Sequence, residues 1–380
     1  MQTGARMPTD SFKSRIESQL SRIYEAGRRK SLPSPSYRHL SSNDYLGLSR
    51  HPSVIEAIVK TTASDGTGAT GSRFLSGNHP LNGMLEEAIA DFKGGPSSIV
   101  FSTGYQANIS LILALSTIYP FIYSDSHNHA SIIDGIRLSG CQYQIFPHND
   151  LEALRGMLEK RPLGESFIIV TESLFSMNGN RSPIAALLNL CDEFDGILLL
   201  DDAHGTGTLG QEGRGGLEHA SLAFNPQRIV LTGTFSKALG GLGGYTVCHP
   251  LIRELVLSTG RSLIYTTALP PGVLAGNLEA LTILDENGEL VENLHSRVRK
   301  VREAIGLPIS SSPILSIKGP IEKLEMISSS LKENGLLAPV IRSPTVPVGE
   351  ECIRICVTNH WEDTFTRLLS ESMIKAQVLL

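Results

Sequence analysis

A lysine, an acid and a histidine stand just after short apolar runs that are predicted to be strands. Lys237 closes the run TFSK at residues 234–237, and Asp201 ends an apolar run and precedes His204 by three residues. An amine that can form a Schiff base, and a carboxylate that can keep a ring nitrogen protonated, are what pyridoxal phosphate requires from a protein. The three residues therefore indicate a pyridoxal phosphate site, in which His204 hydrogen-bonds the ring hydroxyl.

Each of these residues also has a simpler interpretation. Lys237 could be a surface lysine in a glycine-rich loop, and the Asp201 to His204 segment could be a metal site or a helix cap after a strand. The combination of all three residues favours the cofactor over these alternatives, and no metal is predicted.

A phosphate cradle is predicted directly after the first strand, where a Gly-containing turn opens a helix. Backbone N–H groups at a helix N-terminus bind anions readily. The predicted cradle consists of Thr103, Gly104 and Tyr105, and Thr234 adds a hydroxyl.

The group that stacks on the cofactor ring is predicted to be His129, which follows the second strand. His127 is the alternative, and either could be an ordinary loop histidine. The glycine-rich stretches 66–71 and 240–244 do not match a nucleotide-binding loop, since neither has the spacing of a P-loop or a strand-to-helix GxGxxG.

Seven short apolar runs alternate with helix-like stretches between residues 97 and 250. This alternation predicts a mostly parallel sheet with helices on both faces. Ligands bind such sheets beyond the carboxyl ends of the strands, which is where Lys237 and Asp201 stand. The predicted strands are residues 98–101, 121–124, 143–146, 167–170, 197–200, 228–231 and 245–248.

Three parts of the chain are predicted around this sheet. Residues 1–45 form an arm with a helix near 11–29, and residues 46–284 form the large cofactor-binding domain. Residues 285–380 form a smaller α+β domain with short strands near 314–317, 338–341 and 352–357.

The composition is that of an ordinary globular protein. The chain has 380 residues, 41 % of them hydrophobic and 19 % charged, and a formal net charge of -5, which disfavours nucleic acid as a partner. No apolar run approaches the roughly 18 residues of a membrane span, and no signal peptide is apparent, so a cytoplasmic location is expected. Five cysteines, an odd number, favour reduced thiols.

The chain resembles the α-oxoamine synthase family of fold-type I pyridoxal phosphate enzymes over residues 38 to 370. The resemblance implies that fold type, with a seven-stranded mostly parallel sheet and a smaller C-terminal domain. The motifs that carry it are SNDYLGL at 42–48, GSRFLSG at 71–77, NHAS at 128–131, HND at 148–150, DDAHGTG at 201–207 and TFSK at 234–237.

Within the family, residues 264–271 and 341–349 resemble the member that acts in biotin biosynthesis. This implies a decarboxylative condensation of L-alanine with a pimeloyl thioester, carried on coenzyme A or an acyl carrier protein. Lys237 would hold the cofactor and then remove the α-proton of alanine as general base. His129 would stack on the ring and support the acyl carbonyl.

The same resemblance implies further contacts and a homodimer with its sites at the subunit interface. Arg354 would bind the carboxylate of the amino acid, because a guanidinium pairs with a carboxylate through two hydrogen bonds. The other implied residues are Arg342 and Thr345 near the acyl substrate, Ser176 near the ring oxygen, Asn43 near the reacting groups, and Thr266 and Thr267 at the partner's phosphate. The family's N-terminal Leu-Tyr-Arg-like stretch, whose arginine approaches the acyl chain, is replaced here by Arg28, Arg29 and Lys30.

Three alternatives stay open at this point. The chain could be a sibling synthase of the glycine C-acetyltransferase or 5-aminolevulinate synthase type. It could be a catalytically silent homologue, although Lys237, Asp201, His204 and His129 are all present. A nicotinamide oxidoreductase on a similar sheet would need a fingerprint that the sequence lacks.

Overall fold

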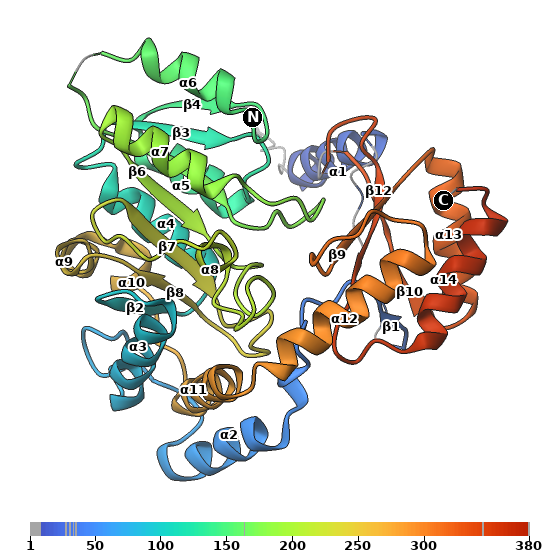
Figure 1. The fold of residues 1–380 in the computed structure, drawn as a ribbon, viewed down its shortest axis with the longest axis horizontal. Coiled ribbons are helices and arrows are strands. Elements are labelled where there is room, and N and C mark those ends of the chain that lie inside the picture. The colour runs from blue at the N-terminus through green and yellow to red at the C-terminus, as the bar shows by residue number, and fades with distance from the viewer. Residues whose placement is uncertain are drawn as a thin grey trace, which may run out of the picture.

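The computed structural model describes residues 9–26, 29, 32, 34, 36–162, 164–343 and 346–378. A large part containing the main sheet and a smaller part containing the C-terminal residues lie side by side (Figure 1). Of the helices in these described ranges, none combines the length and the apolar character needed to cross a membrane.

The main sheet has seven strands in the order β2-β8-β7-β6-β5-β3-β4. Neighbours from β7 to β4 pair in parallel, whereas β8 is antiparallel to both β7 and β2. All seven predicted strands are confirmed, with small shifts at their ends. The strands are β2 Ser98–Phe101, β3 Phe121–Asp125, β4 Gln142–Phe146, β5 Phe167–Glu172, β6 Ile197–Asp201, β7 Ile229–Thr234 and β8 Gly244–Val247.

The central strands are apolar throughout because both faces of the sheet are covered. Leu198 and Leu200 of β6 belong to one buried cluster, while Leu199 between them belongs to a second cluster on the opposite face. The covering elements include α3 Pro80–Lys93, α4 Gly104–Leu115, α5 Ala130–Ser139, α6 Leu151–Glu159, α7 Ile184–Phe194, α9 Pro250–Thr259 and α11 Pro271–Glu286. Shorter or peripheral elements are α2 Pro52–Asp65, η1 Leu48–Arg50, α8 Gly216–His219 and α10 Arg261–Ile264.

The smaller part is built on an antiparallel sheet of β11, β12 and β9, with helices packed beside it. A short parallel pair of β1 with β10 ties the N-terminal arm to it. The proposed domain boundary at 285 falls in the last turn of α11, and it stays a prediction. The elements are α12 Glu289–Ala304, β9 Ile314–Lys318, α13 Ile321–Glu333, β10 Leu336–Leu337, β11 Val340–Ile341, β12 Cys352–Cys356, α14 Asp363–Lys375 and β1 Arg38–His39.

The N-terminal helix is shorter than predicted. It is α1, Thr9–Glu25, and Arg29 lies beyond its end. The prediction that Cys352 and Cys356 belong to a strand is confirmed by β12, and both thiols are free.

A buried ion pair anchors the loop that follows β6. The Nζ atom of Lys93, at the end of α3, lies 2.7 Å from Asp202 Oδ2, 2.8 Å from Thr206 Oγ1 and 2.7 Å from the carbonyl oxygen of Arg214. Both charged side chains are buried, and Ser173 also donates to Asp202. The loop between Asp202 and Arg214 includes His204, so this pair positions a predicted site residue.

Replacing Lys93 with alanine is expected to lower the free energy of unfolding by about 3–5 kcal/mol, because Asp202 would keep a buried charge without its cation. Urea unfolding followed by circular dichroism measures the change. Arg367→Ala, which removes an exposed i,i+4 pair with Glu371 on α14, is the control and is expected to cost less than about 1 kcal/mol. Equal losses in the two variants would contradict this account.

Candidate active site

Lys237 lies just beyond β7 and next to the ends of β5 and β6. Its side chain is half-buried, and burial lowers the pKa of its amine, while the carboxylate of Asp201 acts in the opposite direction. A lowered pKa increases the fraction of neutral amine, which is the nucleophilic and basic form. The predicted Schiff-base lysine is therefore placed among acids at the carboxyl edge of the sheet.

Asp201 is buried at the end of β6 and has two hydrogen-bond donors. The side-chain amide of Asn108 donates to Asp201 Oδ2 at 2.7 Å, and the backbone N–H of Ala203 donates to Oδ1 at 2.9 Å. Both bonds favour the ionised carboxylate. A charged acceptor of this kind is what the protonated ring nitrogen of pyridoxal phosphate requires.

Asn108, on α4, also connects Asp201 to His129. Its Nδ2 atom lies 2.9 Å from Ser131 Oγ, which lies 2.8 Å from His129 Nδ1, and its Oδ1 accepts from Thr232 Oγ1 at 2.8 Å. His129 caps the N-terminus of α5. Asn108 was not among the predicted site residues, although it is a buried amide on a mostly apolar helix.

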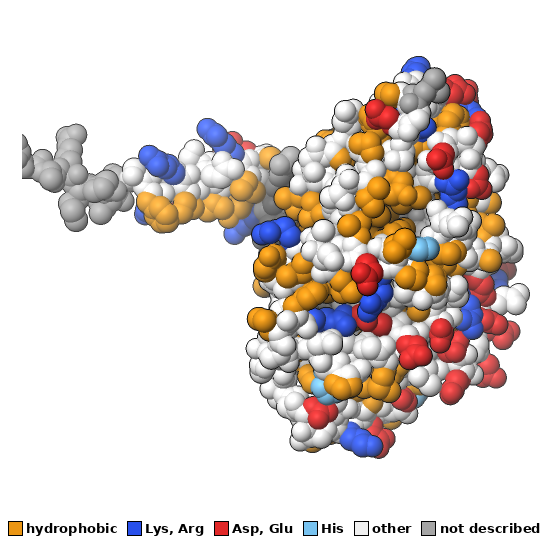
Figure 2. All heavy atoms as spheres, turned by 90° about the vertical axis from the view of Figure 1, so that its left-hand side faces the viewer, with side chains coloured by type: hydrophobic (Ala, Val, Ile, Leu, Met, Phe, Trp, Pro, Cys, Tyr) orange, Lys and Arg blue, Asp and Glu red, His pale blue; other side chains and the backbone are white. Residues whose placement is uncertain are grey.

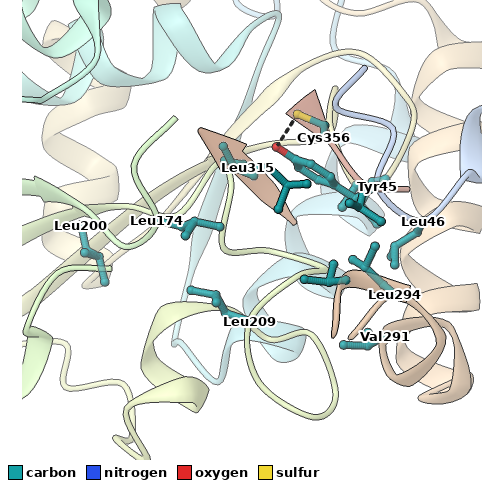
Figure 3. Packing of buried hydrophobic residues seen from close by; sticks show 14 of the residues in the cluster. Tyr45, Leu46, Leu174, Leu200, Leu209, Val291, Leu294, Leu315 and Cys356 are labelled. Carbon is teal, nitrogen blue, oxygen red and sulfur yellow. Dashed lines mark hydrogen bonds between the residues drawn. The ribbon is translucent and has the colours of Figure 1, made fainter. Parts of the chain in front are cut away.

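His204 is buried beside Tyr45. The Tyr45 hydroxyl lies 2.8 Å from His204 Nδ1 and 3.2 Å from Asn43 Oδ1, to which it donates. Burial, followed by the positive charges of Lys237 and Arg354, lowers the pKa of His204 well below its ordinary value, so its imidazole is neutral. Figure 3 shows Tyr45 among apolar side chains, with its hydroxyl directed at Cys356. Tyr45 lies in a motif that was visible in the sequence, but its contact with His204 was not predicted.

Arg354 reaches the site from β12 of the smaller part. Its side chain is buried, its Nη2 atom donates to Asn43 Oδ1 at 2.9 Å, and its Nε donates to the carbonyl oxygen of Ser176. None of the salt bridges between described side chains involves Arg354. A buried guanidinium without a carboxylate partner suits the carboxylate of a bound amino acid.

The predicted phosphate cradle lies at the N-terminus of α4. Thr103 caps the helix by accepting a hydrogen bond from the backbone N–H of Gln106 at 3.1 Å. A Cβ on Gly244 would lie 2.5 Å from the Cα of Gly104, so the backbones of β8 and α4 approach closely here. Thr234 lies against Gly104 at the same point. The helix N-terminus, the glycines and the threonine hydroxyl together fit a phosphate group.

Thr266 and Thr267 lie beside this cradle within the same chain. Gln106 Nε2 lies 3.2 Å from Thr266 Oγ1, and the carbonyl oxygen of Thr267 accepts from Ser102 Oγ at 2.8 Å. Their predicted contact with a partner's phosphate stays a prediction.

The remaining predicted residues make contacts of their own, and their roles stay predictions. Arg342 forms an exposed ion pair with Glu325, and the hydroxyl of Tyr105 donates to Asp134 while its ring meets His129 edge to face. Arg29 lies over the ring of Tyr24. Arg28, Lys30 and Thr345 lie outside the described residues.

His127, the alternative to His129, is occupied elsewhere. Its ring stacks on that of His148 with centroids 4.0 Å apart, and His148 Nδ1 lies 3.0 Å from Asp125 Oδ1. The network through Asn108 and Ser131 therefore favours His129 as the ring-stacking residue.

Comparison of the sequence with known proteins identifies its family. The family model for aminotransferase class I and II matches residues 37–371. The chain belongs to that family. A putative 8-amino-7-oxononanoate synthase of Desulforudis audaxviator is 40 % identical over 361 residues, which cover 90 % of this chain and 93 % of that relative.

Two solved structures have the same fold as this aminotransferase class I and II chain. A serine palmitoyltransferase containing pyridoxal phosphate as an internal aldimine has a TM-score of 0.87 and 27 % identity, and covers 98 % of this chain and 100 % of its own. The 8-amino-7-oxononanoate synthase of Francisella tularensis has a TM-score of 0.75 and 26 % identity, with 90 % and 97 % covered. The predicted fold class is confirmed.

Asn108→Ala is expected to weaken binding of pyridoxal phosphate by about 10-fold or more, since a hydrogen bond to a charged group contributes roughly 1.5–3 kcal/mol. Thr232→Val leaves both donors of Asn108 in place and is expected to have a smaller effect. The dissociation constant, measured from the visible absorbance of the cofactor, checks the order. A Thr232→Val variant that binds as poorly as Asn108→Ala would show that Asn108 does not act through Asp201.

Proposed function

We propose that this chain is an 8-amino-7-oxononanoate synthase, which condenses L-alanine with a pimeloyl thioester and releases carbon dioxide and the free thiol, in biotin biosynthesis. The observation that carries the proposal is the buried Arg354, which has no carboxylate partner among the described side chains and lies close enough to Lys237 for its charge to act on that amine. The 40 % identical relative of that name supports the choice of reaction.

Pyridoxal phosphate, when bound, supplies an electron sink for the α-carbon of the amino acid. Asp201 would hold the ring nitrogen protonated, and the neutral imidazole of His204 would hydrogen-bond the ring hydroxyl. The α4 N-terminus would bind the phosphate. Arg354 would orient the amino acid through its carboxylate, so that the α-hydrogen faces Lys237 Nζ.

Lys237 is the proposed general base. Its pKa is lowered by burial, so the free amine can accept the α-proton of alanine and later return it to the product. The carboxylate of Asp201 raises the same pKa, which keeps the conjugate ammonium stable enough to form. His129 would cover the opposite face of the ring and support the acyl carbonyl.

A cavity of about 410 Å³ near Arg354 has room for the acyl donor. Met177, which lines it, follows Ser176, whose carbonyl oxygen accepts from Arg354. Cys352, which also lines it, lies two residues before Arg354 on the same face of β12, so the cavity adjoins Arg354. Phe175, Ile133 and Val346 give it apolar walls, while Lys318 and Asn178 add polar groups. An apolar acyl chain and a polar thioester carrier both suit this lining.

We also propose that the chain forms a homodimer with its sites at the subunit interface. Apolar side chains on α1 are exposed on one face at helical spacing, namely Phe12, Ile16, Leu20 and Tyr24. Figure 2 shows this helix projecting from the body with its apolar face uncovered. Leu75 and Tyr265 are 86 % and 72 % exposed, and both lie in segments near the phosphate cradle. Large exposed apolar patches mark interaction surfaces.

The second candidate function is a sibling synthase that uses another amino acid. The serine palmitoyltransferase structure, with its TM-score of 0.87, favours testing L-serine, and the glycine-using siblings named above favour testing glycine. A silent homologue is disfavoured because Lys237, Asp201, His204 and His129 are all in place. The predicted cytoplasmic location stays a prediction.

The amino acid substrate can be identified from the visible absorbance of the bound cofactor. The band is expected to change when L-alanine is added at concentrations where glycine and L-serine have little effect. Arg354→Leu should weaken the response to L-alanine by about 100-fold, because it removes a charge-assisted pair of hydrogen bonds. Arg342→Leu, in an exposed pair, is the control and should respond like the wild type.

Lys237→Ala is expected to bind the cofactor without forming the covalent link, and to release no carbon dioxide from L-alanine and a pimeloyl thioester. An enzyme that responds to L-serine or glycine but not to L-alanine would replace the proposed reaction with that of a sibling. A protein that never binds the cofactor would favour the silent homologue.

Sedimentation equilibrium is expected to give twice the chain mass of 41.1 kDa. Replacing Leu75 and Tyr265 with serine should shift the mass toward that of the monomer and lower activity at low protein concentration, since the interface loses apolar area. A monomeric wild type with full activity would contradict the interface proposal.

A further inference from the structure

Glu172 is a buried acid that the roles described so far do not use. It ends β5, its side chain is almost inaccessible to solvent, and its Oε1 atom has no hydrogen-bond partner among the described residues. Buried polar atoms in proteins are nearly always hydrogen-bonded, so an orphaned carboxyl oxygen beside a catalytic lysine needs an explanation.

The pairing of the strands places Glu172 beside Asp201. In the parallel ladder between β5 and β6, the two residues are partners in register, so their side chains lie on the same face of the sheet. Two carboxyl groups at adjacent buried positions repel each other when both are ionised. One of them is therefore expected to keep its proton.

The surroundings of the two carboxyl groups differ. Asp201 accepts from Asn108 and from the backbone of Ala203, and both donors stabilise its negative charge. Glu172 Oε1 has no donor within the described part of the chain, so only the other carboxyl oxygen is left to accept from the backbone. Burial, and then the charge of Asp201, raises the pKa of Glu172 to about 8, although Lys237 and the backbone N–H groups of His129 and Ser176 oppose the shift.

Other charged or titratable groups facing this pair are few. Lys237 faces it from the segment after β7, and His129 faces it from the N-terminus of α5. His204 follows β6, and Arg354 approaches Lys237 from β12. Of these, Lys237 is the one that acts on Glu172 through its charge, so the proton on Glu172 depends chiefly on Asp201 and Lys237.

We propose that Glu172 is a positioning residue that holds one proton for the Glu172–Asp201 pair, so that Asp201 alone carries the negative charge opposite the cofactor ring. The proposal rests on the pyridoxal phosphate site of the proposed function and not on the identity of the amino acid or acyl donor. Glu172 has no covalent part in the reaction. Because Glu172 is protonated, Asp201 is the one ionised carboxylate of the pair and the single charged partner of the ring nitrogen.

Glu172→Gln tests the proposal, because glutamine has the shape of a protonated glutamate but cannot ionise. Its amide N–H replaces the O–H donor of the protonated carboxyl group. In the wild type, the native state binds the Glu172 proton more tightly than the unfolded state between pH 4.5 and about 8. Native stability therefore falls, through this group, as pH rises across that window, and the variant lacks this loss. The melting temperature of the variant minus that of the wild type should rise from pH 5 to 8 and level off above.

The full-length enzyme is melted with and without pyridoxal phosphate, and no amino acid is added. The melting temperature of Glu172→Gln minus that of the wild type is expected to rise by at least about 3 °C from pH 5 to pH 8. This follows from the usual relation between the free energy of unfolding and the melting temperature. A difference that stays constant with pH would overturn the proposal, because it would mean that Glu172 is already ionised in the native protein. The failure of L-alanine to react would leave this measurement unchanged, so the two proposals fail separately.

The bound cofactor gives a second readout. Glu172→Gln should retain the visible band of the cofactor at pH 7 with a dissociation constant within about threefold of the wild type. Asp201→Asn, the matched change on the other acid, should weaken binding far more. If Glu172→Gln is folded but loses the cofactor as completely as Asp201→Asn, then Glu172 carries a needed charge and the proposal is wrong.

Discussion

The carboxylate of Asp201 must remain charged inside the protein, and much of the site follows from this requirement. An unpaired buried carboxylate would take up a proton, so it needs donors at close range. One donor is the backbone of Ala203, which comes with the turn after β6. The other is Asn108, which is available only because α4 crosses the sheet with its N-terminus at the strands' carboxyl edge. The helix that stabilises the acid is thus the same helix that offers its N-terminus to a phosphate.

Alternation along a strand separates two acids that are neighbours in the sequence. Asp201 shares a face of the sheet with Leu199 and turns toward Asn108, whereas Asp202 turns to the opposite face and pairs with Lys93. A single Asp-Asp dipeptide therefore serves two purposes. One acid faces the proposed cofactor, and the other fixes the loop that includes His204.

Much of the architecture could be predicted from the sequence because it rests on local patterns. The seven apolar runs match β2 to β8, and the residues at their carboxyl ends, Asp201 and Lys237, do meet at one edge. Parallel pairing brings strand ends together whatever the details of the helices. The contacts made by Asn108, Tyr45 and Glu172 could not be found in the same way, since each depends on the packing of one element against another. Arg342 is a different case, because its motif was visible and its side chain pairs with Glu325, while its contact with the acyl substrate stays a prediction.

The smaller part of the structure contributes a buried arginine to the site. Arg354 of β12 is held by Asn43 from the arm and by the carbonyl oxygen of Ser176 from the loop after β5, so three segments distant in the chain meet at one guanidinium. Polar contacts alone would not hold these segments, but Tyr45, Leu294 and Leu315 belong to the same apolar cluster as Leu200 of the main sheet. The apolar core thus spans the two parts and fixes the distance between Arg354 and Lys237. A ligand that contacts both groups at once must fit that distance, so the packing of the two parts sets the size of the ligand that could reach both.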